Sequence, residues 1–433
     1  MKVAVLGGGF VGLSAAFYIS KKGHKVSLFE KEHVLGGLAA GFKQDNWDWY
    51  LERAVHHWFT NDWDIRRFAE EIGFNKIIFK TPLTASLYDN SRIIPLDSPQ
   101  DLLKFPYLPM LDKLRAGLVL AFIKLGPFFS FYEKNTAEEF LKKTMGERAW
   151  NALWKDLFRK KFGKYAVNIM ASFIWARLKK RTRKLGYPQG GFQALLDHGE
   201  KELDRLGVKV LKGYNVERIE KKRDKFIIYS SFKKDEFDIV ISTLPTPILV
   251  KLTQDLFPRK YLEKLKGIRY KHAISLIIES KDSFLDRAYW INMADPKNPI
   301  MGIFQHTNFM DKKHFAGNNI LYVGNYVDFD DPKIRMNDEE IFNWYRPYLK
   351  RINPKFQIPK ANRISTSKSQ IRNYYVFKGP FAQPIFDKEF LNNKPDFKTP
   401  LKNFYIANLD MTYPYDRGTN YAVKLGKEVA RFL

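Results

Sequence analysis

Three glycines and one acid near the start of the chain have the types and spacing that bind a dinucleotide. Gly7, Gly9 and Gly12 follow a short apolar run, and Glu30 closes a second apolar run after an amphipathic stretch. Gly7 permits a tight turn, Gly9 lets the backbone approach a pyrophosphate, and Gly12 lets a helix pack closely on a strand. Free N–H groups at the start of that helix attract the anion, and Glu30 can accept hydrogen bonds from a ribose.

A second glycine motif narrows the choice of dinucleotide. The doublet Gly36-Gly37 lies a few residues beyond Glu30. It resembles the second flavin motif of the amine oxidase, protoporphyrinogen oxidase and phytoene desaturase superfamily, which implies FAD as the cofactor. Members of this superfamily often carry arginine after the doublet, whereas this chain has Leu38.

These residues require a strand, a glycine turn, a helix and a second strand, which is their order in the sequence. We therefore predict an α/β fold with a Rossmann-type FAD-binding domain, a discontinuous β-rich substrate domain and a helical insertion. The predicted FAD-binding domain comprises residues 1–87, 186–268 and 387–433. The predicted insertion is 88–185, helical and basic, and the predicted substrate domain is 269–386, where short β-rich runs precede a helix.

Composition and charge exclude several classes of function. The 433 residues contain no cysteine, which excludes disulfides, thiolate metal sites and cysteine nucleophiles, and we predict no metal site. The formal net charge of +26 indicates an anionic partner, which can be a membrane surface, a nucleic acid or a phosphorylated substrate. Nucleic acid is not expected, because we find no zinc finger, RNP-like sequence or helix-turn-helix signal.

The insertion carries both apolar and basic features. Its apolar stretch, residues 116–132, is broken by Lys124 and by Gly126-Pro127, so it is shorter than the roughly 20 residues that a bilayer span needs. Eleven basic residues lie between 155 and 184 with Asp156 as the only acid, a pattern that indicates an anionic lipid surface or a phosphate group. Because Met1 leads directly into the first strand, we expect a cytoplasmic protein that binds the membrane peripherally. A buried helical hairpin and a solvated charged face are the alternatives.

Four further side chains are candidates for chemistry on a substrate. His56 and His57 follow the flavin motif closely, Arg417 lies in a glycine turn before the last helix, and His306 lies in the predicted substrate domain. Histidine can exchange a proton near neutral pH, and arginine can hold an anion. The alternatives are histidines that orient the backbone and an internal Asp416–Arg417 ion pair.

The resemblance to the FAD-dependent oxidoreductases extends over the whole chain. The blocks 51–62, 186–192, 305–308 and 413–422 are similar to bacterial and archaeal members described as protoporphyrinogen oxidase-like. Residue by residue, this resemblance implies that the cofactor is bound at positions along the chain from the first glycine turn to the last helix, which are Gly7, Gly9, Phe10, Val11, Gly12, Glu30, Lys31, Gly37, Leu38, Val216, Asn408, Arg417, Gly418, Thr419 and Asn420. Among these, Asn420 and the N–H groups of Gly418 and Thr419 would stabilise the reduced flavin.

The resemblance also implies the activity. We predict an FAD-dependent oxidoreductase that transfers hydride to or from a hydrophobic substrate, such as an isoprenoid, a polyprenyl phosphate or a tetrapyrrole, at a membrane surface. The first alternative is a non-redox nucleotide-sugar mutase resembling UDP-galactopyranose mutase. The second is a lipid-binding protein that retains FAD without turnover. The sequence leaves the oligomeric state open.

Overall fold

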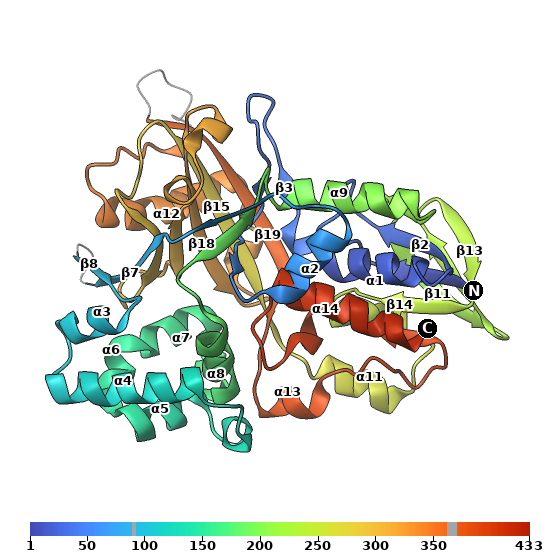
Figure 1. The fold of residues 1–433 in the computed structure, drawn as a ribbon, viewed down its shortest axis with the longest axis horizontal. Coiled ribbons are helices and arrows are strands. Elements are labelled where there is room, and N and C mark those ends of the chain that lie inside the picture. Colours follow the sequence, from blue (N-terminus) through green and yellow to red (C-terminus); the bar gives the residue numbers. More distant parts are fainter. Residues whose placement is uncertain (89–91, 362–369) are drawn as a thin grey trace.

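The computed structural model describes residues 1–88, 92–361 and 370–433. Residues 89–91, in the predicted insertion, and residues 362–369, in the predicted substrate domain, lie outside the described residues. Figure 1 shows three groups of elements: a parallel sheet covered by helices near both termini, a larger sheet beside it, and a group of helices below that sheet.

The predicted Rossmann-type domain is confirmed by a five-stranded sheet in which every neighbouring pair of strands is parallel. Its order is β10 (Lys209–Lys212), β2 (Lys25–Glu30), β1 (Lys2–Leu6), β14 (Ile239–Ser242) and β20 (Phe404–Ile406). Because segments far apart in the sequence supply these strands, the domain is discontinuous.

The central strands of this sheet are apolar on both faces, so each face needs a cover. In β1, Val3 and Val5 pack in the core under the helices, while Ala4 and Leu6 pack in the core on the opposite face. The helices on the first face are α1 (Phe10–Ser20), α9 (Phe192–Arg205) and α14 (Thr419–Val429). The opposite face is covered by β11 (Val216–Lys222), β12 (Lys225–Ser230), β13 (Lys233–Phe237), α10 (Thr246–Leu252) and α11 (Arg259–Lys266).

A seven-stranded sheet forms the second body. Its order is β19 (Ile371–Pro384), β15 (Tyr270–Ser280), β18 (Asn319–Val327), β17 (Gly302–Gln305), β16 (Ala288–Met293), β7 (Leu83–Tyr88) and β8 (Arg92–Pro95). Alternate residues of β15 and β18 pack against α12 (Asp338–Ile352), and the residues between them face the Rossmann-type domain. This sheet therefore supplies one wall beside the dinucleotide domain.

One predicted domain boundary is wrong. The sequence placed the boundary between 87 and 88, but β7 and β8 both belong to the seven-stranded sheet, because β7 pairs in parallel with β16 and antiparallel with β8. The helical group begins at α3. Its helices are α3 (Pro99–Lys104), α4 (Met110–Leu125), α5 (Ala137–Met145), α6 (Glu147–Leu153), α7 (Lys155–Phe162) and α8 (Ala171–Lys180).

The helical group has an apolar core of its own, which includes Ile123, Trp150 and Ile174. Within the described ranges, no helix combines the length and the apolar character that crossing a bilayer requires. The remaining short elements are β3 (Gly41–Phe42), β4 (Leu51–Glu52), β5 (Trp58–Phe59), α2 (Trp63–Glu71), β6 (Ile77–Lys80), β9 (Leu185–Pro188) and α13 (Lys388–Asn393).

Candidate FAD and substrate site

The glycine turn between β1 and α1 has the geometry that the sequence predicts. Gly7 has a φ of +103°, and a Cβ added at Gly12 would lie 1.8 Å from the carbonyl oxygen of Gly7. Gly9 is the N-cap of α1 and no side chain caps this helix, whose first residues are Phe10 and Val11. A Cβ at Gly9 would meet no protein atom closer than 4.0 Å. The turn therefore leaves the N–H groups of α1 and the space over Gly9 available to a pyrophosphate.

Glu30 lies at the carboxyl end of β2, beside this turn. Its buried carboxylate accepts hydrogen bonds from the N–H groups of Gly8, at 2.7 Å, and Glu32, at 2.9 Å. The carbonyl of Glu30 accepts from the N–H of Tyr214, at 2.8 Å, which brings Val216 at the start of β11 close to the same strand end. Lys31, in contrast, is exposed beside Glu32, and its ammonium lies 3.7 Å from that carboxylate.

The second glycine motif packs directly on the first. The N–H of Gly36 donates to the carbonyl of Gly8 at 2.9 Å, and Gly9 and Gly36 form a parallel bridge. Gly37 has a φ of +55° and is exposed, while Leu38 reaches toward Gly379 in β19. The two motifs therefore form one continuous backbone surface, which suits a long cofactor.

The last helix brings a second glycine N-cap to this region. Gly418 is the N-cap of α14, which no side chain caps. The Thr419 hydroxyl accepts a hydrogen bond from the indole N–H of Trp58, at 2.8 Å. The Asn420 amide oxygen accepts from the N–H of Ile65 in α2, at 3.1 Å. The Asn420 amide nitrogen donates to the carboxylate of Asp64 in α2, at 3.5 Å. The donor roles of Asn420 and of the Gly418 and Thr419 N–H groups near the flavin stay predictions.

The side chain of Asn408 also forms its hydrogen bonds within the protein. It is 1 % exposed, and its amide nitrogen donates to the carbonyl of Leu244, at 3.0 Å, and to the hydroxyl of Thr246, at 2.9 Å. Its amide oxygen accepts from the N–H of Asp410. The side chain therefore fixes the end of β20 beside β14, and only its backbone remains for the predicted cofactor contact.

His56 lies where the glycine-capped helices meet. Its ring centroid is 5.5 Å from that of Phe192, the first residue of α9, and Phe192 in turn contacts Phe10 of α1. The Nδ1 of His56 donates to the carbonyl of Ala54 at 2.7 Å, which leaves Nε2 as an acceptor. Desolvation lowers the pKa of His56 to about 4, although solvent still reaches the half-buried ring. A neutral His56 can therefore accept a hydrogen bond at Nε2.

His57 faces the seven-stranded sheet. Its Nδ1 lies 3.1 Å from the hydroxyl of Tyr289, and its ring centroid is 5.5 Å from that of Trp290 in β16. Desolvation, with further contributions from Arg181 and other nearby bases, lowers the pKa of His57 to about 3. The prediction that the two histidines titrate near neutral pH is therefore wrong, because burial beside cations disfavours the imidazolium.

Arg417 lies close to His56. The predicted ion pair between Arg417 and Asp416 does not form. Its guanidinium donates to the hydroxyl of Tyr326 in β18, and its charge is one cause of the low pKa of His56. The Asp416 carboxylate instead lies 2.6 Å from the ammonium of Lys161 and 3.8 Å from the guanidinium of Arg177. The sequence treated these two bases as part of a surface charge run, because it gives no sign of which bases turn inward.

His306 does not reach this region. It is 1 % exposed, its ring is surrounded by Tyr187, Phe315 and Tyr322, and neither ring nitrogen has a hydrogen-bond partner in the described structure. Aromatic side chains enclose the ring, and the substrate-side role of His306 stays a prediction.

Glu52 is a buried acid that the sequence did not single out, although it lies in the block 51–62. It is 0 % exposed and accepts hydrogen bonds from the hydroxyl of Tyr187 and, at 2.8 Å, from the N–H of Phe192. Its carboxylate thus caps α9 beside His56. Desolvation raises its pKa from 4.5 to about 7.

This raised pKa predicts a pH dependence of stability. Between pH 4.5 and 7 the unfolded chain loses the Glu52 proton while the folded protein keeps it, so stability falls as pH rises, by about 3 kcal/mol in total. Glu52→Gln keeps an acceptor for Tyr187 and Phe192 and removes this loss. We expect the difference in thermal midpoint between Glu52→Gln and the unmodified protein to change in favour of the variant as the pH is raised from 5 to 8. Glu52→Leu should be destabilised at every pH, and parallel curves for Glu52→Gln and the unmodified protein would contradict the assignment.

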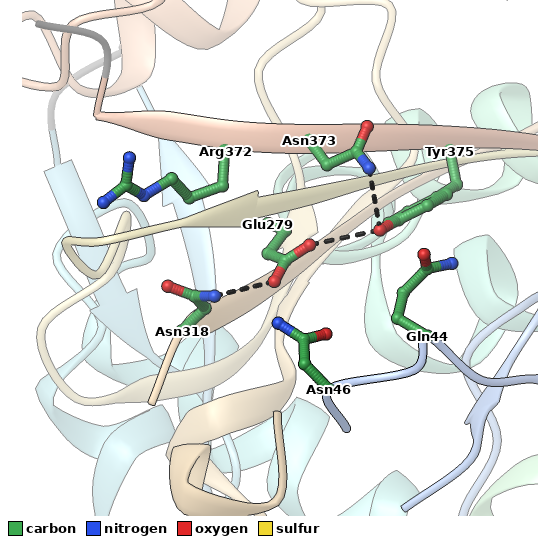
Figure 2. Close-up of a pocket in the computed structure, with 7 residues that line it drawn as sticks. All are labelled: Gln44, Asn46, Glu279, Asn318, Arg372, Asn373 and Tyr375. Atoms are coloured by element: carbon green, nitrogen blue, oxygen red, sulfur yellow. Dashed lines mark hydrogen bonds between the residues drawn. The ribbon is translucent and has the colours of Figure 1, made fainter. Parts of the chain in front are cut away.

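A separate polar pocket lies at the far end of β15. Figure 2 shows it, with a volume of about 350 Å³ and a lining of Gln44, Asn46, Glu279, Asn318, Arg372, Asn373 and Tyr375. The Glu279 carboxylate accepts hydrogen bonds from Asn318, at 2.7 Å, and Tyr375, at 3.1 Å. Glu279 pairs with Ile320 across the sheet, whereas Tyr326 pairs with Ala273 near the opposite end of β15. This pocket is therefore distinct from the region around His56 and Arg417.

Comparisons with known proteins agree with this geometry. The family model of the flavin containing amine oxidoreductases matches residues 10–432. The 15-cis-phytoene desaturase of Glycine max is 22% identical over 471 residues, covering 100% of this chain and 79% of the plant protein. An oxidoreductase from Methanosarcina mazei superposes with a TM-score of 0.74 at 16% identity, covering 100% of both chains. Reduced UDP-galactopyranose mutase superposes with a TM-score of 0.75 at 15% identity, covering 99% of this chain and 94% of the mutase. These two structures share the fold.

Proposed function

Because this chain belongs to the flavin containing amine oxidoreductases and is an FAD-dependent oxidoreductase, we propose that it acts on a hydrophobic substrate drawn from a membrane surface. The substrate would be an isoprenoid, a polyprenyl phosphate or a tetrapyrrole-like molecule. The observation that carries this proposal is an exposed apolar stripe on the helical group.

The cofactor's place follows from the residues already described. FAD supplies a hydride acceptor or donor when it is bound. The N–H groups at the start of α1 would hold its pyrophosphate, Glu30 its adenosine ribose, and the N–H groups of Gly418 and Thr419 its ring. On the substrate side, the neutral His56 would accept a hydrogen bond at Nε2, while Trp290 and Phe192 would exclude water.

The apolar stripe runs along α4. Leu111, Leu118 and Leu125 are 80%, 74% and 80% exposed, with Leu114 and Phe122 about half exposed between them. Their spacing repeats every three or four residues, so they share one face of the helix. Large exposed apolar patches mark interaction sites. The basic residues of the same helical group would attract anionic lipid, which makes a membrane surface the partner that fits both features.

Charged substitutions in the stripe are expected to weaken membrane binding. The double variant Leu111→Asp/Leu118→Asp should reduce partitioning into phosphatidylglycerol vesicles by about tenfold or more, because burial of each leucine contributes roughly 2 kcal/mol. The measurement is co-sedimentation at low and high salt, and high salt should release the unmodified protein. The matched control is Phe232→Asp, which changes an apolar side chain that is 71% exposed outside the helical group. Equal binding of both variants would contradict the proposal.

A nucleotide-sugar mutase is the second candidate, and it is favoured by one observation, the basic side chains Lys161 and Arg177 at Asp416 with Arg417 near Lys161. The two functions differ in electron balance. We would reduce the bound flavin without oxygen, add prenyl phosphates or nucleotide sugars, and follow the flavin absorbance. Reoxidation coupled to a changed lipid supports the oxidoreductase on a hydrophobic substrate. Sugar rearrangement with the flavin still reduced would overturn it in favour of the mutase.

A further inference from the structure

Three bases from different parts of the chain lie close together near one carboxylate, and two of them contact it. Lys161 of α7 lies 2.6 Å from Asp416, and Arg177 of α8 lies 3.8 Å from it. Arg417 precedes α14, and its guanidinium lies 5.1 Å from the ring of Tyr326, over which Lys161 lies at 5.9 Å. We call Lys161, Arg177, Arg417 and Asp416 the cation cluster. Its members are far apart in the chain and meet only in the folded protein.

The cation cluster has more positive charge than it can neutralise. Lys161, Arg177 and Arg417 carry three positive charges, and among the described residues Asp416 is the one acid that forms an ion pair with any of them. Two positive charges are therefore left over. The nearby Arg181 is neutralised separately by Asp97, at 3.0 Å. Desolvation and the charges of Arg177 and Arg417 together lower the pKa of Lys161 to about 8, against the opposing effect of Asp416. Such crowding of like charges is costly in a protein interior and is typical of sites that bind an anion.

The cluster also has donors that the protein does not use. The Arg177 side chain is 30% exposed, and within the described ranges its one ion pair is the 3.8 Å contact with Asp416. Guanidinium groups carry five N–H donors in a planar arrangement that suits the oxygens of phosphate. Solvent reaches Arg417 as well, although burial lowers its pKa to about 10. Unused donors on two arginines therefore remain for a ligand.

The position of the cluster relates it to the candidate site. The charge of Arg417 lowers the pKa of His56, and the charge of Arg177 lowers the pKa of His57. Arg177 and Arg181 lie 5.9 and 4.8 Å from the ring centroid of Trp290, which itself contacts His57. An anionic group at the cluster would therefore hold the adjoining part of a ligand along Trp290 and the two histidines.

We propose that the cation cluster binds the phosphate of a substrate whose remainder is apolar, so that Arg177 and Arg417 select a phosphorylated lipid over the corresponding alcohol. This inference rests on the proposed function and narrows its substrate class. Two uncompensated positive charges match a phosphate monoester dianion. Electrostatic binding at one end leaves the apolar chain to lie against the aromatic side chains near His57.

The test uses the FAD-loaded protein and the perturbation of its flavin absorbance. The probes are geranylgeranyl monophosphate, geranylgeraniol and inorganic phosphate. We expect the lipid phosphate to bind at least tenfold more tightly than the alcohol. Arg177→Gln should weaken the lipid phosphate roughly thirtyfold and leave the alcohol unchanged, because it removes a charged hydrogen-bonding partner. Arg177→Lys, which keeps the charge, should recover part of the affinity. Asp416 keeps its ion pair with Lys161 in both variants, so we expect both to fold.

The matched control is Arg159→Gln, which removes the same charge from an exposed position on α7. It should bind like the unmodified protein. Equal affinity for the lipid phosphate and the alcohol would overturn the phosphate site and leave the hydrophobic substrate standing. Binding of inorganic phosphate with neither lipid bound would support the anion site and overturn the proposed lipid substrate. Equal losses in Arg159→Gln and Arg177→Gln would show a diffuse charge effect and overturn the assignment to the cluster.

Discussion

Replacing Gly12 by alanine is expected to produce a colourless protein of much lower stability. The added Cβ would lie 1.8 Å from the Gly7 carbonyl oxygen, and this atom is backbone that cannot rotate away. Helix α1 would have to move off β1, which breaks the turn that presents the N–H groups to the cofactor. We expect a loss of about 3 kcal/mol or more in unfolding free energy. The measurements are the FAD-to-protein ratio after purification and the thermal midpoint.

A substitution at Gly9 distinguishes a loss of FAD binding from a loss of folding stability. A Cβ at Gly9 would meet only the Gly36 carbonyl oxygen, at 4.0 Å, and its φ of −72° is accessible to alanine. Gly9→Ala should therefore keep the stability of the cofactor-free protein while it lowers FAD affinity, because the new methyl group occupies the approach to the pyrophosphate. Normal FAD content in both variants would mean that the cofactor does not lie over this turn.

Gly426→Ala is expected to destabilise the protein where two helices cross. The added Cβ would lie 1.9 Å from the Ser14 hydroxyl oxygen, 2.5 Å from the Val11 carbonyl oxygen and 2.7 Å from the Ala15 nitrogen. Helices α1 and α14 would have to separate, and both carry glycine N-caps of the candidate FAD site. Overpacking of this kind costs about 1–3 kcal/mol, more than the gain of roughly 1 kcal/mol from replacing a helical glycine.

The matched control for Gly426 is Gly117, another glycine inside a helix. A Cβ at Gly117 in α4 would lie 3.8 Å from Cδ2 of Leu102, which is an ordinary van der Waals contact. Gly117→Ala should therefore raise or preserve the thermal midpoint, since only the helix propensity changes. If Gly426→Ala unfolds at the same temperature as Gly117→Ala, the close crossing of α1 and α14 is not as described.

Local patterns carried much of the fold prediction. The glycine turn, β2 and the final helix follow from short motifs in which neighbouring residues set the backbone, and the structure confirms the Rossmann-type domain. The sequence pattern did not identify the sheet to which β7 and β8 belong. It assigned β7 to the FAD-binding domain and β8 to the helical insertion, whereas both lie in the seven-stranded sheet. A strand's partner is decided by hydrogen bonds to distant segments, and nothing in residues 83–95 specifies β16 as that partner.

Some residues of the candidate site were also predictable from the sequence, and others were not. The spacing of Gly7, Gly9, Gly12 and Glu30 predicted a dinucleotide site, since each of these residues acts through its own backbone or its adjoining strand. The charge run at 155–184, in contrast, was treated as one surface. In the structure Lys161 and Arg177 turn toward Asp416, while Lys155 and Lys164 face solvent.

The sequence by itself determined the cofactor-binding turn, because short-range spacing encodes it, and its resemblance to known flavin enzymes implied the family. Only the tertiary structure decided the states and partners of the charged side chains. Burial at the junction of α9 and the second sheet holds His56 neutral and raises the pKa of Glu52 to about 7. Desolvation and the approach of distant charges set these properties, and both depend on which segments meet in space.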